Sequence, residues 1–361
     1  MRRLNYQEAK DIQMGSSILS TGGGGDMQLG MDALEIAYKN QKDIFIMDLD
    51  ELDPEEYYAS VGLIGAVSDD APIIEELDLL KHSIEIIEEH IGMPLGGIIP
   101  PEFGGITGEI LAVGAMMGKP IIDCDCVGRA VPSMIQDTFN IVNRGAKAPI
   151  SVVSMDGSFI VIDEDVDPDE LEERLRKIAI ASGNIAAFAV NVTQGKHIKS
   201  STINNALSMC EKVGRARREA IDSDKNPIDS IINMTDGYEL FKGQINKKSY
   251  WETKDGFTIG EIFIDGTNDF SDQNFKIWMQ NENLISWKND KVYVSCPDLI
   301  CILDANSLIP ISNPNWNQDQ EVIVLGFKSP LLWRTEKGID LFGPRVFGYK
   351  FNFIPIEKYF K

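Results

Sequence analysis

Two acidic residues near the middle of the chain are the sharpest candidates for chemistry. Asp123 and Asp125 stand two residues apart at the end of a short apolar run. Side chains at that spacing in an extended segment point to the same side. Such a pair could hold a divalent cation, share a proton as acid and base, or form a purely structural cluster with Arg129. The residues alone leave these three interpretations open.

A run of four glycines forms a second candidate site, directly before a helical stretch. Glycine lets backbone amides approach an anion or a carbonyl closely, although neither Walker A nor dinucleotide-binding spacing is present. The alternative is a flexible turn capped by an aspartate. We predict a substrate-binding role, because four glycines carry an entropic cost that a plain turn does not require. The residues concerned are Thr21, Gly22, Gly23, Gly24, Gly25 and Asp26.

Two further side chains occupy loops after strand-like segments. Glu102 precedes a helical segment, at a position where open α/β sheets bind ligands, but a single loop glutamate is often only solvated. His197 joins a buried strand to a helix and could be a metal ligand or a base, or a loop histidine in contact with solvent. His82 and His90 fall in an acidic amphipathic helix and are expected at the surface.

The elements that must position these residues alternate along the first half of the chain. Compact apolar runs bounded by Gly, Pro or Asp predict short strands, and apolar residues at helical spacing predict the helices between them. This alternation indicates an α/β region in which helices cover both faces of a largely parallel sheet. The predicted strands are 44–47, 61–67, 97–99 and 120–123, and the predicted helices are 31–39, 73–91 and 107–117.

A dense acidic run at residues 163–170 predicts an exposed linker. It divides the chain into domains at 1–166 and 167–361. The second domain is expected to begin as mixed α/β, with a helix at 169–181, a strand at 185–192 and a helix at 200–220. From residue 237 onward, alternating apolar and polar residues with turn signals predict mostly antiparallel β structure.

Composition limits the possible functions. The chain has 361 residues and a formal charge of −22, which repels nucleic acid and anionic lipid. No apolar run approaches the roughly 18 residues of a membrane helix, and no export signal is visible. Five cysteines show no disulfide framework, and Cys124 and Cys126 are too close for a zinc knuckle. We expect a cytoplasmic protein with reduced thiols.

The motifs together resemble the S-methyl thiohydantoin desulfurase-like family, formerly a domain of unknown function. The resemblance implies an α/β N-terminal region, a β-rich C-terminal region, association with hydantoinase/oxoprolinase proteins, and hydrolysis of a thiohydantoin-type ring substituent. The family's acidic pair is matched by Asp123 and Asp125, although their cysteine neighbours differ. The segments that carry the resemblance are residues 19–26, 102–105, 123–132, 281–284, 297–300 and 343–349.

These observations predict a hydrolase of a five-membered cyclic amide or amidine, assisted by a divalent metal. Zinc is the first choice, and an oxygen-rich site could select manganese or magnesium. Asp123, Asp125 and His197, with Glu102, would be ligands or the general base, while Arg129 would pair with an acid or orient Asp125. The glycine run would hold the substrate through backbone amides. The expected partners are the substrate, another copy of the chain or a hydantoinase/oxoprolinase-type protein. The competing hypothesis is a non-catalytic binding protein or an accessory subunit of such a complex.

Overall fold

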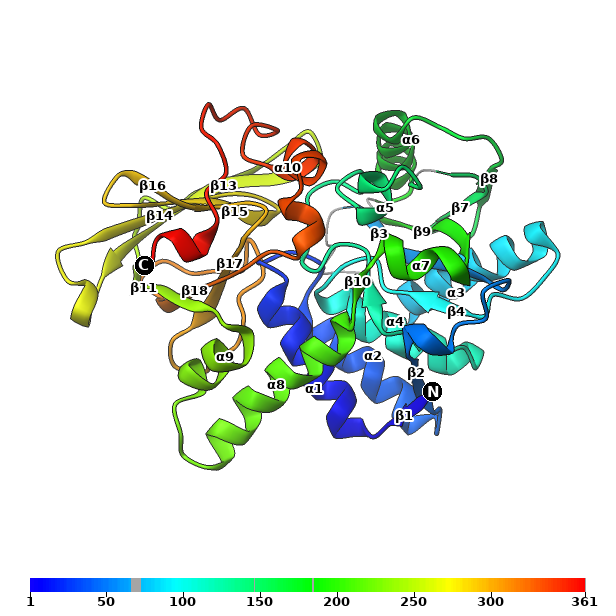
Figure 1. The fold of residues 1–361 in the computed structure, drawn as a ribbon, viewed down its shortest axis with the longest axis horizontal. Coiled ribbons are helices and arrows are strands. Elements are labelled where there is room, and N and C mark those ends of the chain that lie inside the picture. The colour runs from blue at the N-terminus through cyan, green and yellow to red at the C-terminus, as the bar shows by residue number, and fades with distance from the viewer. Residues whose placement is uncertain (66–72, 146, 184, 361) are drawn as a thin grey trace.

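Two eight-stranded sheets organise the chain. The computed structural model describes residues 1–65, 73–145, 147–183 and 185–360. Figure 1 shows the α/β region, which contains the N-terminus, beside the second sheet, where the C-terminus lies. The predicted fold class, α/β followed by a largely antiparallel β region, is confirmed.

The first sheet is mixed rather than largely parallel. β2, β5, β4 and β3 run parallel, and the remaining strands join them antiparallel in the order β1-β2-β5-β4-β3-β9-β7-β8. The antiparallel additions come from segments outside the alternating region, so its pattern could not show them. The strands are β1 (Arg2–Leu4), β2 (Ile44–Met47), β3 (Tyr57–Gly65), β4 (Gly97–Ile99), β5 (Ile121–Ile122), β7 (Ile150–Ser154), β8 (Phe159–Ile162) and β9 (Ile185–Gln194).

Helices cover both faces of this sheet. α3 and α4 pack on one face, and α6 packs on the other, where alternate residues of β9 such as Ala186 and Phe188 face it. α1, α2 and α8 form a further layer outside α4. The helices are α1 (Tyr6–Leu19), α2 (Met27–Lys39), α3 (Ile73–Ile91), α4 (Gly105–Met117), α5 (Thr138–Ile141), α6 (Pro168–Ala181), α7 (Gly195–Ser201), α8 (Ala206–Asp222) and α9 (Pro227–Thr235).

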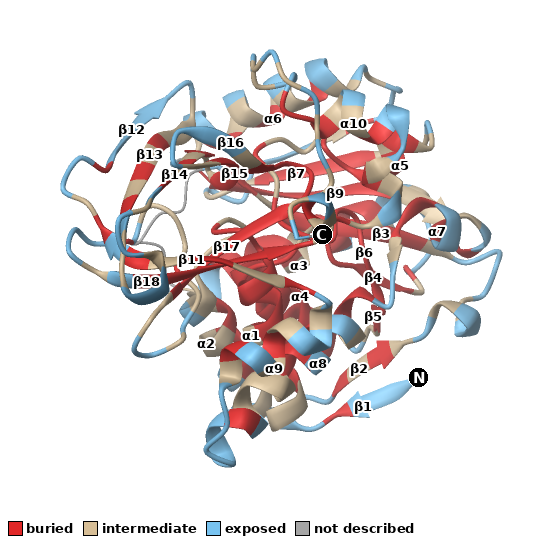
Figure 2. Cartoon of the chain, turned by 60° about the vertical axis from the view of Figure 1, so that its left-hand side comes forward, coloured by how far each residue is buried: buried red, intermediate tan, exposed pale blue. Residues whose placement is uncertain are grey.

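The second sheet has the order β16-β15-β14-β13-β11-β18-β17, with β12 paired to β13. All its pairings are antiparallel. Figure 2 shows buried residues along the strands of both sheets. The elements of this region are β11 (Tyr238–Ile245), β12 (Tyr250–Lys254), β13 (Phe257–Gly266), β14 (Asn274–Gln280), β15 (Glu282–Lys288), β16 (Lys291–Ser295), β17 (Leu299–Asp304), β18 (Glu321–Phe327) and α10 (Glu336–Phe342).

The segment 200–220, predicted as one helix, is three elements. α7 ends at Ser201, and β10 (Ile203–Asn204) then pairs with β6 (Cys124–Asp125) before α8 begins. β9 and α8 also belong to the first unit by their packing, although they follow the predicted boundary at residue 166. The predicted strand at 61–67 corresponds to β3 up to Gly65, and its last two residues lie outside the described residues. Among the described helices, none is long and apolar enough to cross a bilayer.

α1 and α8 pack in close contact through glycine. A Cβ atom on Gly214 would lie 1.9 Å from the Asp11 carbonyl oxygen, and one on Gly15 would lie 1.8 Å from the Cys210 carbonyl oxygen. α1 was not predicted because its buried face includes polar residues such as Gln13. The Gln13 side-chain amide donates to the Gly104 carbonyl, which connects this layer to the loop before α4.

Replacing Gly214 with alanine should force α1 and α8 apart. We expect Gly214→Ala to lower the free energy of unfolding by about 1–3 kcal/mol, the usual range for overpacking. Urea denaturation measures this, with Lys212→Ala on an exposed position of the same helix as the control. Equal stability of the two variants would contradict the close contact.

Candidate functional site

A cavity of about 520 Å³ is lined by residues of both sheet regions. The first region contributes the glycine run and Glu102, and the second contributes Glu282 and Asn313. This volume is within the usual size range of small-molecule sites. The cavity therefore brings two of the predicted segments together with residues that follow them by more than 150 positions.

The glycine run adopts a backbone conformation that few other residues tolerate. Thr21, Gly22, Gly24 and Gly25 all have positive φ, from 61° to 88°. A Cβ atom on Gly23 would lie 1.9 Å from a carboxyl oxygen of Glu282. Glycine is therefore required here both by left-handed backbone angles and by close packing.

Hydrogen bonds attach the glycine run to both halves of the molecule. The Asn283 amide donates to the Thr21 carbonyl and the Asn313 amide to the Gly22 carbonyl, each at 2.8 Å. At the start of α4, the Ile106 amide donates to the Gly24 carbonyl at 3.1 Å. The glycine run thus fixes the segment before α4, which carries Glu102, relative to the start of β15, which carries Glu282.

Glu102, which is half-buried, and Glu282, which is buried, form a carboxyl pair on the cavity wall. Glu102 Oε2 accepts from the Val131 amide at 3.0 Å, while Glu282 Oε2 has no partner within the described residues. Burial, and then the negative charge of Glu282, raises the pKa of Glu102 well above its ordinary value. Burial also raises the pKa of Glu282, and the nearby Arg129 guanidinium opposes that rise. The repulsion between the two negative charges favours a state in which the pair retains one proton.

Arg129 is fully buried and joins segments rather than facing the cavity. Its guanidinium donates to the Thr21 hydroxyl at 2.9 Å and to the carbonyls of Pro297, Asp298 and Asn283 at 3.0 to 3.2 Å. From the sequence, Arg129 was expected to pair with an acid or to orient Asp125, or to form a structural cluster with the two aspartates. None of its hydrogen bonds goes to Asp125, because these acceptors occupy its donors. Arg129 is a positioning residue for the glycine run and the segment after Glu282.

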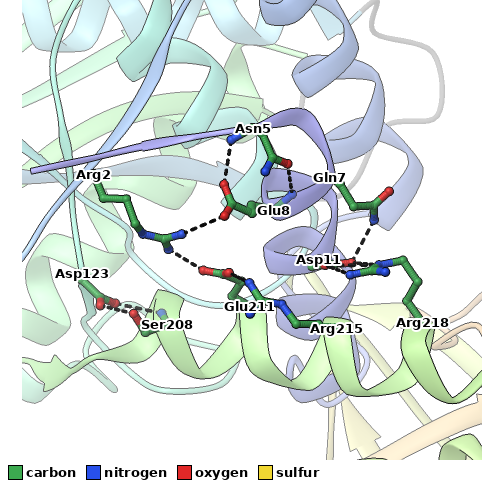
Figure 3. Close-up of polar contacts among 10 residues, drawn as sticks. All are labelled: Arg2, Asn5, Gln7, Glu8, Asp11, Asp123, Ser208, Glu211, Arg215 and Arg218. Atoms are coloured by element: carbon green, nitrogen blue, oxygen red, sulfur yellow. Dashed lines mark hydrogen bonds and ion pairs between the residues drawn. The ribbon is translucent and has the colours of Figure 1, made fainter.

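Asp123 and Asp125 do not face a common ligand. Asp123 accepts from the backbone and hydroxyl of Ser208 at 2.9 and 2.5 Å, so it caps the first turn of α8 (Figure 3). Asp125 accepts from the amides of Val127 and Gly128 in the following turn. Neither carboxylate lines the cavity. The expectation that both point to one site fails because each satisfies local backbone donors.

His197 lies on α7 and is not grouped with the aspartates. Within the described parts of the chain, no group of three or more His, Cys, Asp or Glu side chains is arranged to hold a metal ion. The predicted ligand set of Asp123, Asp125 and His197 is therefore not assembled. The backbone carbonyl of His197 instead accepts from the hydroxyls of Ser200 and Ser201, within α7.

Several cavity residues were missed in the sequence. Asp137 is the N-cap of α5 and accepts from the Asn191 side chain at 2.7 Å, and burial raises the pKa of Asp137 to about 7. Glu282 follows Asn281, whose positive φ makes the turn between β14 and β15. The sequence did contain a signal for Glu282: it stands between two asparagines at the start of an apolar strand. A charged residue is rarely buried at such a position without a reason.

Comparison with known proteins agrees with this architecture. Family models described as the S-Me-THD-like N-terminal domain and C-terminal domain match residues 7–164 and 166–356. The chain belongs to the S-Me-THD-like family. This family is named for an enzyme, S-methyl thiohydantoin desulfurase.

A solved structure shares the fold of this S-Me-THD-like chain. The crystal structure of a protein from Chromobacterium violaceum superposes with a TM-score of 0.81 and 18% sequence identity, covering 99% of this chain and 100% of that one. At that identity the likeness shows the fold alone. No curated protein matches this chain.

The Arg129 contacts predict a large stability loss on a conservative change. Lysine cannot reproduce the planar fork of the guanidinium, so Arg129→Lys should leave buried acceptors unpaired. Each unpaired buried group costs about 1–3 kcal/mol. We therefore expect the substitution to lower the free energy of unfolding by about 2–4 kcal/mol. Chemical denaturation gives this value. Arg174→Lys, at an exposed ion pair, serves as the control and should change stability by less than about 1 kcal/mol. A similarly small effect at Arg129 would contradict its positioning role.

Asp125 predicts a specific pH dependence of stability. Burial raises the pKa of Asp125 to about 7, although two backbone amides oppose the rise, whereas the unfolded chain releases this proton near pH 4. Between these values the folded state holds the extra proton, so raising the pH lowers the free energy of unfolding, by up to about 1.4 kcal/mol per pH unit.

Asp125→Asn should remove this contribution and flatten the curve between about pH 4 and pH 7. Urea unfolding at several pH values tests it, and Asp290→Asn at an exposed turn is the control. An unchanged slope in Asp125→Asn would show that Asp125 is ionised in the folded protein.

Proposed function

We propose that this chain is a hydrolase of a small five-membered cyclic amide or amidine of the thiohydantoin or hydantoin type. One observation carries the proposal: two carboxyl groups, the half-buried Glu102 and the buried Glu282, come from different halves of the chain and line one small-molecule cavity. Membership of a family named for a desulfurase supports the choice of substrate class.

The pair supplies both a general base and a general acid, because it favours holding one proton. The ionised carboxylate takes a proton from water as the water oxygen bonds to the ring carbon that carries a methylthio group. The protonated carboxyl gives its proton to the adjacent ring nitrogen. The carbon–sulfur bond then breaks, and the thiol leaves with the proton taken from water. The hydroxyl on the ring carbon gives its proton to the carboxylate that protonated the nitrogen, so the ring carbon becomes a carbonyl and the pair again holds one proton.

Neutral polar groups orient the ring in this proposal. Asn313 lines the cavity, and its side-chain oxygen is buried with no partner among the described residues. This oxygen is suited to accept from a ring N–H, since an unpaired buried acceptor costs free energy. Gly24 and Gly25 also line the cavity, where their backbone approaches a ligand without side chains between them.

A divalent metal, zinc first, stays a prediction from the sequence. The residues predicted to hold it do not converge, so no step above passes through a metal. A hydantoinase/oxoprolinase-type partner and self-association likewise stay proposals. Under the accessory-subunit alternative, the cavity would bind the ring, and turnover would need a second chain.

Hydrolysis of S-methyl thiohydantoin, followed as thiol release, tests the proposed reaction. We expect Glu102→Gln and Glu282→Gln each to lower kcat at least about 100-fold, the range for loss of a general acid or base. Glutamine keeps the side-chain shape of the protonated acid, so both variants should fold.

Glu173→Gln, at an exposed position on α6, is the matched control and should keep full activity. Full turnover by both pair variants would contradict the mechanism. Ring binding without turnover by the wild-type chain, alone and with a hydantoinase-type partner, would favour the non-catalytic alternative.

A further inference from the structure

A second pair of buried carboxyl groups lines the same cavity. Glu76 projects from α3 and Glu109 from α4, and each residue is only 3% exposed. Both come from the first sheet region, whereas Glu282 comes from the second. The mechanism proposed above uses neither of them.

The Glu76–Glu109 pair has unused hydrogen-bonding capacity. Glu109 Oε2 is buried and has no partner within the described chain. Burial raises the pKa of Glu76 to about 7, although a side-chain hydrogen bond with Glu109 opposes the rise. Burial, the charge of Glu76 and the same hydrogen bond raise the pKa of Glu109 to about 8. The causes of these two shifts include no basic side chain. An unpaired carboxyl oxygen in such a place is costly unless a donor reaches it.

The cavity lining as a whole favours positive charge in a ligand. Arg176 is the single basic residue of the lining within the described residues. Its Nε lies 2.5 Å from a carboxyl oxygen of Glu172, and its guanidinium stacks on the Phe257 ring at 4.0 Å. This arginine is therefore already paired, and the remaining ionisable groups of the lining are acidic. Walls of one sign attract ligands of the other.

We propose that Glu76 and Glu109 form a second subsite, which binds a protonated nitrogen on the ring's substituent. The group is an ammonium, amidinium or guanidinium, whose N–H donors make charge-assisted hydrogen bonds to the two carboxyls. This inference rests on the proposed function, because it places the ring at Glu102 and Glu282. The substrate class narrows to rings with a cationic side chain.

Calorimetric titration with three matched hydantoins tests the subsite. Their 5-substituents are 4-aminobutyl, butyl and 3-carboxypropyl, so they differ in charge at the end of a similar chain. We expect the aminobutyl compound to bind wild type about tenfold or more tightly than the butyl compound, and the carboxypropyl compound to bind most weakly. In the double variant Glu76→Gln/Glu109→Gln, the aminobutyl and butyl compounds should bind equally tightly, and the affinity for the butyl compound should be the same as in wild type.

If the double variant does not fold, Glu109→Gln alone is measured, and it should reduce the preference for the aminobutyl over the butyl compound. Glu75→Gln, at an exposed position on α3, is the control and should keep that preference. Equal binding of the aminobutyl and butyl compounds to wild type would overturn the subsite, as would a preference that survives in the variants.

Butylammonium alone separates this inference from the proposed function. If no hydantoin binds or turns over, but butylammonium binds wild type and not the variants, the ring chemistry fails and the cation subsite stands. If the S-methyl thiohydantoin with the same butyl substituent is hydrolysed, but the aminobutyl compound is not preferred over the butyl compound in binding, the proposed function stands and the subsite fails.

Discussion

The site depends on the burial of a single arginine between the two sheet regions. Arg129 has no exposed surface, and its guanidinium donates to Thr21, to Asn283 and to the carbonyls at residues 297 and 298. Desolvating a guanidinium is costly, and only a full set of acceptors offsets that cost. Those acceptors belong to the glycine run and to the second sheet, so satisfying Arg129 also fixes the two halves of the cavity relative to each other.

That arrangement produces an acidic cavity in which some carboxyl groups remain protonated at neutral pH. The glycine run packs directly against Glu282 and against the loop that carries Glu102. Carboxyl groups with little access to water retain protons that solvated carboxyls release. Burial thus gives the Glu102–Glu282 pair its proposed acid and base roles. It also leaves Glu109 Oε2 without a partner among the described residues, so this oxygen can accept a hydrogen bond from a cation.

The sequence predicted the elements whose signals are local. β2, β4 and α3 have the predicted bounds, because compact apolar runs and helical spacing are decided within a few residues. Glu102 and the glycine run were recognised by their positions before helices, and both line the cavity. Asp123 and Asp125 look the same in sequence whether they face a ligand or a backbone amide, and only the placement of Ser208 and of the turn at residues 127–128 distinguishes the two. The asparagines beside Glu282 mark it as an unusual position, but its place opposite Glu102 depends on the pairing of distant segments, which no local pattern contains.

Isotope-edited infrared spectroscopy of the carboxyl groups shows whether Glu102 and Glu282 together retain a proton. Difference spectra between wild type and Glu282→Gln, and between wild type and Glu102→Gln, isolate the signals of this pair as the pH is changed. The account predicts a protonated carboxyl that persists at neutral pH in wild type and titrates in two separate steps, with each substitution altering the titration of the remaining glutamate. Two carboxylates that both ionise below about pH 5, as solvated glutamates do, would contradict it.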